Sequence, residues 1–430
     1  LEGSGLVLQN NDGDDLPIDT DGGFTFDTPV EPGSTYNVTV LTHPSDPRQV
    51  CKVENGSGDV PNISVTNVAV TCVDPDLIFL IKVAAEGDTL ADDTVLKNIL
   101  LDGGVGINFD GQVAFGGRDG NGNDAVFTQG GRVVKEDDTL DDGNILAEFR
   151  GQGEVAINAS LSQSGGKVAF HGQAEAGKND TAAVFTQAGK VAAVGAILSD
   201  GITVNDIESQ GKVAIDNFDQ VTFLGSVEIE DGFYDDHFRV VIFADGVETW
   251  VAAQEGSNLP DGDPLDAITE SGGVAINDID EVAFHGQTGA FKAVFTQEGV
   301  VAKMGTDLPD GTILDDINED GGVAINLMSE VAFHGQTGSV KAVFISDGQT
   351  TQVVARVGDT LPDGNTLNDI DVSGGVAINL YGEVAFHGQT GGVKAVFTQN
   401  GVVAKVGDIV DDGNTLDEIS SSAGVAINPY

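Results

Sequence analysis

An internal repeat constrains the fold of this chain more than any other feature. A short element of the form GVAIN recurs about every 50 residues, beginning at Val105, Val155, Val213, Val274, Val323, Val376 and Val425. In repeats of this length, each unit buries its apolar surface against its neighbours. We therefore expect residues 75–430 to form one body of similar units.

Each unit contains four short apolar runs. In residues 375–408 they are GVAIN, EVAFHG, KAVFTQ and VVAKVGD, and an acidic loop of the kind seen at 361–370 lies between units. The runs are nearly continuous in Val, Ala, Ile and Phe, which indicates strands covered on both faces. Four strands in about 50 residues match one β-propeller blade. An open β-solenoid is the alternative, but its units are usually about 20 to 30 residues long.

The order of residues in the repeat also resembles TolB-like propeller repeats. In that family an Asn/Asp-Gly turn joins the two innermost strands, and residues 379–382 (NLYG) match it, whereas residues 326–329 (NLMS) depart from it. The resemblance covers about 350 residues and implies a propeller, but a fold of this kind hosts many functions.

Residues 1–74 show a different pattern, of short alternating strands bounded by turn residues. The runs lie at 6–8, 23–26, 36–40, 50–53 and 65–73, which predicts a small antiparallel sandwich ending near Asp74-Pro75-Asp76. The segments GSGLVLQN, GFTF, YNVTV and VTNVAVTC resemble immunoglobulin-like modules of secreted and surface proteins of bacteria. In such modules another strand commonly precedes the segment that begins this chain.

The only two cysteines, Cys51 and Cys72, lie in this first segment. We expect one disulfide, which would stabilise so small a domain by about 3 kcal/mol. Two unpaired buried thiols are the alternative. A disulfide favours an extracellular or cell-surface location.

Counting strands around the expected ring raises a question of closure. The GVAIN and VVAKVGD elements each occur seven times, whereas the VAF and AVF elements each occur six times. The fold is therefore all-β, with a disulfide-linked immunoglobulin-like sandwich at 1–74 and a six- to seven-bladed propeller at 75–430. Residues beyond Tyr430 could supply the missing strands, six blades could close alone, or another molecule could donate strands.

Strand donation would use the two ends of the molecule, because an open strand edge is a template for pairing. Head-to-tail contacts of this kind do not close, so they build filaments. The candidate assembly strands are marked by Leu6, Val7, Leu8, Ile78, Phe79, Ile81, Val425 and Ile427.

The charge of the chain excludes several partners. Asp and Glu number 69 against 19 Lys and Arg, for a net charge of −50, which disfavours nucleic acid and anionic membranes. The longest apolar run, Leu77 to Ala85, is interrupted by Lys82 and is too short to span a bilayer. We expect no membrane insertion.

One insertion departs from the repeat and is the candidate ligand or metal site. It combines aromatic and ionisable groups, and its ligand candidates are Glu228, Glu230, Asp231, Asp235, Asp236 and His237. An ordinary surface loop is the alternative. The acidic loops at 307–311 and 359–363 could bind calcium weakly, although solvated turns are the favoured interpretation. We expect no other cofactor.

Histidine recurs at one place in four repeats, at His171, His285, His334 and His387. Blade symmetry keeps equivalent positions too far apart to share one metal ion, so we expect them to form hydrogen bonds. No catalytic constellation stands out, and the chain is predicted not to be an enzyme. The leading hypothesis is an extracellular structural protein that self-assembles, with a monomeric surface adhesin or ligand-binding propeller second and a polysaccharide hydrolase or lyase third.

Overall fold

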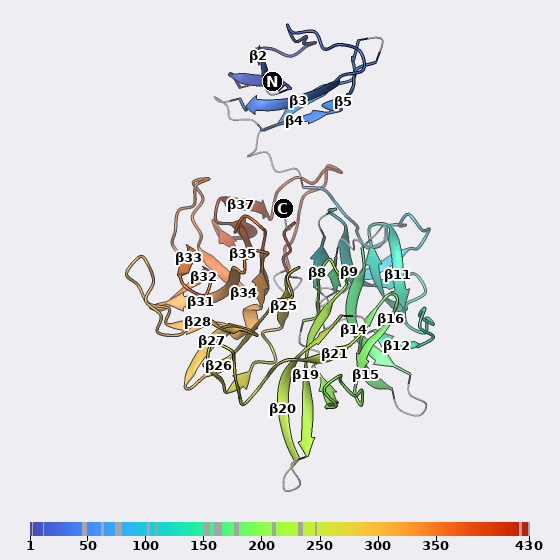
Figure 1. Cartoon of the computed structure of the whole chain (residues 1–430), viewed down its shortest axis with the longest axis vertical. Coiled ribbons are helices and arrows are strands. Elements are labelled where there is room, and N and C mark those ends of the chain that lie inside the picture. The colour runs from blue at the N-terminus through green and yellow to red at the C-terminus, as the bar shows by residue number, and fades with distance from the viewer. Residues whose placement is uncertain are drawn as a thin grey trace. The chain divides into compact units, whose positions relative to one another are not determined.

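The computed structural model describes two compact units, residues 1–79 and 80–430 (Figure 1). Its description covers residues 1, 3–11, 13–44, 50–61, 64–73, 80–100, 104–108, 110–149, 155–158, 166–175, 180–208, 212–230, 235–245, 247–420 and 424–428. Both units are built of antiparallel strands, and the described residues include one short 3₁₀ helix, η2 (Glu319–Gly321). Each unit is considered by itself.

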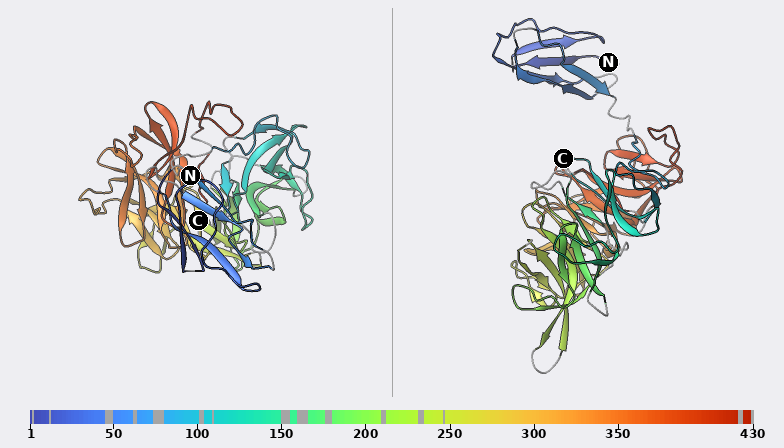
Figure 2. Two further views of the ribbon diagram at one scale, coloured as in Figure 1. Left: turned by 90° about the horizontal axis from the view of Figure 1, so that it is seen from above. Right: turned by 90° about the vertical axis from the view of Figure 1, so that its right-hand side faces the viewer.

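Unit 1 contains two small sheets (Figure 2). The first has the strand order β2-β1-β3-β5, and the second pairs β4 with β6. Their bounds are β1 (Leu6–Asn10), β2 (Asp14–Ile18), β3 (Thr35–Thr42), β4 (Val50–Glu54), β5 (Ser57–Asp59) and β6 (Ala69–Val73). Along β1 the even-numbered residues Leu6, Leu8 and Asn10 are buried, as period-two alternation requires.

The predicted disulfide between Cys51 and Cys72 is confirmed. It joins residues directly opposite each other on β4 and β6, so it lies within one sheet. In antibody domains the disulfide instead links the two sheets. The bond therefore does not itself establish an immunoglobulin topology.

The described residues of unit 2 form six sheets of the repeating kind. Sheets 1 and 2 consist of β7 (Leu96–Ile99), β8 (Val105–Ile107), β9 (Val113–Asp119), β10 (Asp124–Thr128), β11 (Gly131–Lys135), β12 (Leu146–Phe149), β13 (Ala156–Ile157), β14 (Val168–Ala174), β15 (Thr181–Thr186) and β16 (Gly189–Ala193). Sheets 3 and 4 consist of β17 (Thr203–Ile207), β18 (Ala214–Ile215), β19 (Val221–Glu230), β20 (Asp235–Ala244), β21 (Thr249–Gln254), β24 (Ala267–Ile268), β25 (Val274–Ile276), β26 (Val282–Thr288), β27 (Phe291–Thr296) and β28 (Gly299–Lys303).

Sheets 5 and 6 complete the set. They consist of β29 (Asp316–Ile317), β30 (Val323–Ile325), β31 (Val331–Thr337), β32 (Val340–Ser346), β33 (Thr351–Arg356), β34 (Asp369–Ile378), β35 (Val384–Thr390), β36 (Val393–Thr398) and β37 (Gly401–Lys405). A separate short pair, β22 (Ser257–Asn258) and β23 (Pro264–Leu265), precedes sheet 4.

The predicted order of the four runs within a blade is confirmed. In each sheet the GVAIN-type strand pairs with the VAF strand, which pairs with the AVF strand, which pairs with the outermost strand; in sheet 5 these are β30, β31, β32 and β33. The structure adds a second strand at the innermost position. The end of each preceding acidic loop, such as β29, also pairs with the VAF strand, and in sheet 6 the two inner strands merge into β34.

Apolar contacts between adjacent sheets hold unit 2 together. Five clusters of buried residues join sheet 1 to sheet 2, and so on to sheet 6. Two stacked phenylalanines lie in five of the sheets, as for Phe333 and Phe344, whose centroids are 5.4 Å apart. Both phenylalanines are fully buried. The inner strands of successive sheets contact one another, which arranges the sheets around a common axis as in a β-propeller.

The two ends of unit 2 meet between sheets 6 and 1. Leu80 forms a parallel bridge with Val410, and the Asp411 N–H donates to the Leu80 carbonyl at 2.8 Å. The Lys82 ammonium lies 3.3 Å from the Asp412 carboxylate. Within the described part of the chain, no buried apolar cluster joins sheet 6 to sheet 1 as the five clusters join the others. This junction is called the seam below.

Candidate functional site

The described residues of the acidic insertion lie at the ends of two long paired strands. Strands β19 and β20 have ten residues each and extend beyond the rest of sheet 3 (Figure 1). The register places Glu228 opposite His237 and Glu230 opposite Asp235. His237 is exposed, and its Nδ1 lies 3.1 Å from Asn205 Nδ2.

The remaining candidate ligands of this insertion are outside what the structure describes. Asp231 lies among the residues that are not described, and so do the side chains of Glu230, Asp235 and Asp236. Among the residues that are described anywhere in the chain, no group of three or more His, Cys, Asp or Glu side chains is arranged to hold a metal ion. The metal site at the insertion therefore stays a prediction.

In four sheets an aspartate of the acidic loop accepts a hydrogen bond from a backbone N–H of the outermost strand. Asp363 accepts hydrogen bonds from the Asn365 N–H at 2.9 Å and from the Val402 N–H of β37 at 2.7 Å. Asp92, Asp142 and Asp261 make the equivalent bonds in sheets 1, 2 and 4. Burial opposes ionisation, but these N–H donors outweigh it and hold the pKa of Asp363 below its ordinary value. The carboxylates are occupied by the protein's own backbone.

The four repeated histidines are buried between sheets. His285 and His334 are fully buried, and His171 and His387 are 1% and 4% exposed. His334 Nε2 lies 3.1 Å from the Gly375 carbonyl of sheet 6, so it forms the expected hydrogen bond. Burial lowers the pKa of His285 to about 3 and that of His334 to about 4. Both imidazoles are therefore neutral at physiological pH and suit a structural role.

A small channel runs along the common axis of unit 2. Its volume is about 180 Å³, and the inner strands line it with the side chains of Ile107, Ile157, Ile215, Ile276, Ile325 and Ile378. In sheets 1, 2, 4 and 5 this isoleucine is followed by an asparagine whose amide donates to the next sheet. Asn108 Nδ2 donates to the Asn158 carbonyl at 2.9 Å, and Asn326 Nδ2 donates to the Asn379 carbonyl at 3.0 Å. We call this set of bonds the asparagine ring.

The asparagine ring includes the last described element of the chain. Asn428 Nδ2 lies 3.5 Å from the Asn108 carbonyl, so residues 424–428 occupy a seventh inner position beside sheet 1. Val425 and Ile427, expected as assembly residues, are half-buried there and belong to no assigned strand. The ring thus has seven inner elements but six full sheets among the residues described.

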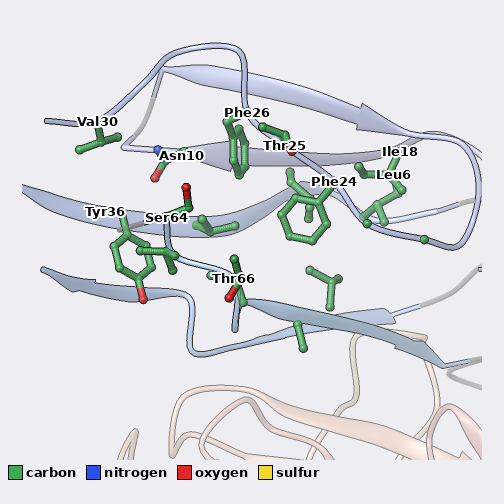
Figure 3. Close-up of a pocket in the computed structure, with 18 of the residues that line it drawn as sticks. Leu6, Asn10, Ile18, Phe24, Thr25, Phe26, Val30, Tyr36, Ser64 and Thr66 are labelled. Carbon is green, nitrogen blue, oxygen red and sulfur yellow. The ribbon is translucent and has the colours of Figure 1, made fainter. Parts of the chain in front are cut away.

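A further cavity lies in unit 1. It is an open groove of about 870 Å³, lined mainly by apolar side chains of β1, β3 and β6 and of the segments 18–30 and 60–68. Figure 3 shows Leu6, Ile18, Phe24 and Phe26 around this space, with Tyr36 at one end. Phe24 and Phe26 pack edge to face, with centroids 6.0 Å apart. We call this cavity the unit 1 groove.

The groove runs beside an open strand edge. Strand β6 pairs with β4 on one side, and among the described residues no strand pairs with its other side. Val70 and Cys72 of β6 line the groove. An unpaired edge beside an apolar groove offers both backbone hydrogen bonds and side-chain pockets to an extended strand.

The other expected assembly residues differ in whether the structure leaves them open to a partner strand. Strand β1, which carries Leu6, Val7 and Leu8, pairs with β2 on one side and β3 on the other, so the expectation that it is an open assembly strand is wrong. Ile78 and Phe79 lie outside the described residues. Ile81 is 71% exposed at the seam.

Comparison with known proteins adds little beyond the fold. No protein-family model matches the chain, and no curated protein matches it. The β-propeller domain of the Trilobed protease from Pyrococcus furiosus is 9% identical, with 86% of this chain and 90% of that one covered and a TM-score of 0.36. Aleuria aurantia lectin is 12% identical, with 74% and 98% covered and a TM-score of 0.34. A polysaccharide lyase is 11% identical, with 73% and 74% covered and a TM-score of 0.27.

The disulfide indicates that the protein matures in an oxidising environment. Among the described residues, no helix is long and apolar enough to cross a membrane.

Proposed function

We propose that the protein is an extracellular structural protein of a bacterium, with an immunoglobulin-like module and a TolB-like propeller, that assembles with copies of itself. A strand of one copy enters the unit 1 groove of the next and adds to the open edge of β6. The observation that carries the proposal is this groove of about 870 Å³ beside an unpaired strand. β-augmentation combines backbone bonds with side-chain burial in this way.

The donor strand is the segment Leu80–Ala85 at the seam. Its apolar residues Ile81 and Val83 are 71% and 43% exposed, and they alternate with Lys82, which is held by Asp88 and Asp412. A segment of this kind presents two large apolar side chains to one side, which suits a groove lined by Leu, Ile and Phe. Since donor and acceptor lie in different units of the chain, the contact repeats head to tail and does not close.

The large negative charge sets the conditions for assembly. A net charge of −50 makes copies repel one another, and salt screens this repulsion over about 8 Å at physiological ionic strength. Assembly should therefore require moderate salt or calcium, although nothing in the proposal requires a dedicated cation site.

The test is electron microscopy and sedimentation of the full chain across salt and calcium concentrations. The wild type should form elongated polymers, and Ile81→Asp and Val83→Asp should abolish them while leaving the far-ultraviolet circular dichroism unchanged. Ile197→Asp is the matched control, because Ile197 is a 74% exposed apolar residue elsewhere in unit 2. Discrete monomers of the wild type under every condition would refute self-assembly. If Ile81→Asp formed polymers of the same length and amount as the wild type, the segment Leu80–Ala85 would not be the donor strand.

A further inference from the structure

The asparagine ring contains a second repeated contact. In four sheets the amide of the ring asparagine also donates to the side chain four residues later. The distances are 2.8 Å for Asn108 to Gln112, 2.9 Å for Asn277 to Glu281, 2.8 Å for Asn326 to Glu330 and 3.3 Å for Asn379 to Glu383. One NH₂ group thus supplies two hydrogen bonds, one within its own sheet and one to the next sheet.

Sheet 3 departs from this pattern at the ring residue, while its second position carries glutamine as Gln112 does in sheet 1. Its ring residue is Asp216, and the residue four positions later is Gln220. Asp216 Oδ1 accepts from the Phe218 and Gln220 N–H groups at 3.0 and 2.8 Å. Asn277 Oδ1 accepts from Ile279 and Glu281 in the same way, at 3.1 and 3.0 Å. Asp216 Oδ2 therefore takes the place of the asparagine amide nitrogen.

That place requires a donor, and a carboxylate has none. Asp216 is only 3% exposed, and its Oδ2 is a buried atom with no hydrogen-bond partner. Gln220 Oε1 is also buried without a partner, and it stands where Glu281 and Glu330 accept the bond in their own sheets. Leaving two buried acceptors without a donor is costly, and in the other sheets an asparagine amide supplies that donor.

The charged groups around Asp216 add to this requirement. From sheet 4, Asp278 and Asp280 lie close enough to act on Asp216 electrostatically. Asp278 is held by the Asn217 N–H and Nδ2 at 2.9 and 2.8 Å. From sheet 2, Lys167 approaches the same turn, but its ammonium pairs with Asp219 at 2.8 Å. Lys212 precedes the inner strand β18, and its side chain extends away from Asp216 to lie beside Gly322 and Gly375.

We propose that Asp216 carries a proton in the folded protein, so that its Oδ2–H supplies a donor where the other sheets have an asparagine amide, and that loss of this proton near neutral pH weakens the ring at sheet 3. The acid replaces an amide at one position of seven, which makes sheet 3 the pH-sensitive link of an otherwise pH-independent ring.

The electrostatic environment supports a protonated Asp216. Burial is the largest effect, and it outweighs the Gln220 and Phe218 N–H groups and acts with Asp278 and Asp280 to raise the pKa of Asp216 to about 7. In the unfolded chain an aspartate titrates near its ordinary value of about 3.9. The folded state therefore binds more protons between these two values. Its stability falls as the pH rises from about 4 to about 7, and the loss is complete above that range.

The experiment compares thermal unfolding of the full chain and of Asp216→Asn between about pH 5 and about pH 8.5. Asparagine supplies the donor at every pH, so the melting temperature of Asp216→Asn relative to that of the wild type should rise by about 3 °C or more between about pH 5 and about pH 7 and stay constant above that range. Asp280→Asn is the control, because it removes one negative charge from the neighbouring turn and leaves the ring contact in place. Its difference from the wild type should change little across this range.

Infrared difference spectroscopy provides a direct readout of the proton. The wild type near pH 6 should show a protonated carboxyl band that is absent in Asp216→Asn and disappears as the pH rises. Parallel pH profiles of the wild type and Asp216→Asn would overturn the proposal, because the Gln220 amide would then be donating to an ionised Asp216. A second result would also overturn the proposal. The wild type would show no carboxyl band at pH 6, and calcium chloride or sodium chloride would restore its lowered melting temperature at alkaline pH. The oxygens of Asp216 and Gln220 would then hold a cation and not share a proton.

Discussion

At the scale of single residues, the glycine of the HGQ sequence shows how closely the blade is packed. A Cβ added to Gly335 would lie 2.5 Å from the Asp316 carbonyl oxygen, which belongs to the backbone of β29 and has little freedom to move. The equivalent glycines Gly286 and Gly388 meet the carbonyls of Ala267 and Asp369 at 2.4 and 2.5 Å. Glycine at this position therefore permits the second inner strand to pair.

We predict that Gly335→Ala destabilises unit 2 by about 1–3 kcal/mol, because the new methyl group displaces β29 or distorts β31. Gly130→Ala is the control, since its nearest neighbour would be the Thr128 hydroxyl at an ordinary 3.5 Å. Urea unfolding followed by tryptophan fluorescence and circular dichroism measures both. Equal free energies of unfolding for the two variants would show that the inner strand tolerates the added methyl group.

The sequence could predict the repeated histidines but not the reason for the glycine beside them. Burial and hydrogen bonding of His334 follow from its place in an apolar strand. The role of Gly335 depends on β29, which belongs to a segment rich in Asp and Asn and poor in apolar residues. Such a composition indicates a loop, and the two-residue strand forms only because the VAF strand lies alongside it.

At the scale of elements, the acidic loops are the least expected part of the blade. Their composition predicts solvated turns or weak calcium sites. In four of the sheets an aspartate of the loop instead accepts a hydrogen bond from a backbone N–H of the outermost strand, as Asp92, Asp142, Asp261 and Asp363 do. Sequence alone could not show this, because the partners are 39 to 48 residues apart in the chain. The same hydrogen bond repeats in several sheets, so its contribution to the stability of unit 2 is repeated around the ring.

We predict that Asp363→Ala lowers the free energy of unfolding by about 1 kcal/mol near neutral pH, because the Val402 and Asn365 N–H groups lose their charged acceptor. The folded-state pKa of Asp363 is depressed, so this contribution is present above its ordinary pKa and is lost as the pH falls through the acidic range. Urea unfolding should therefore show a larger difference between Asp363→Ala and the wild type at about pH 7 than at about pH 3. Asp417 is exposed, so Asp417→Ala should leave the free energy of unfolding unchanged at both pH values. If Asp417→Ala lowered the free energy of unfolding as much as Asp363→Ala does, the cause would be the change in net charge.

At the scale of the whole molecule, the repeat predicts most of unit 2 and little of unit 1. The period, the four runs and the missing middle strands at the ring junction can all be counted in the sequence, because near-identical units must adopt near-identical structures. The unit 1 groove could not be predicted in this way. Its open edge depends on which strands pair with β6, and a single copy of a pattern does not specify the pairing of distant strands.

Asp216 lies between these two cases. The change from GVAIN to KVAID is visible in the sequence, yet asparagine and aspartate are both ordinary residues at a strand end. Its significance becomes clear only when the neighbouring sheets show that the ring position requires a donor. A departure from a repeat is informative where the repeated residue makes a contact between units.

The division into two units leads to a prediction about the disulfide. Both cysteines lie in unit 1, and the bond closes a loop with a sequence separation of 21 residues. Cross-links over loops of this size stabilise a fold by about 3 kcal/mol, largely by restricting the unfolded chain. Calorimetry of the full chain should therefore show two transitions, of which a reducing agent lowers only that of unit 1. The Cys51→Ala, Cys72→Ala double variant should reproduce the lowered transition and be insensitive to the reducing agent. If reduction shifted both transitions together, the two units would unfold as one cooperative body, and the groove could not open to a strand while the ring stays folded.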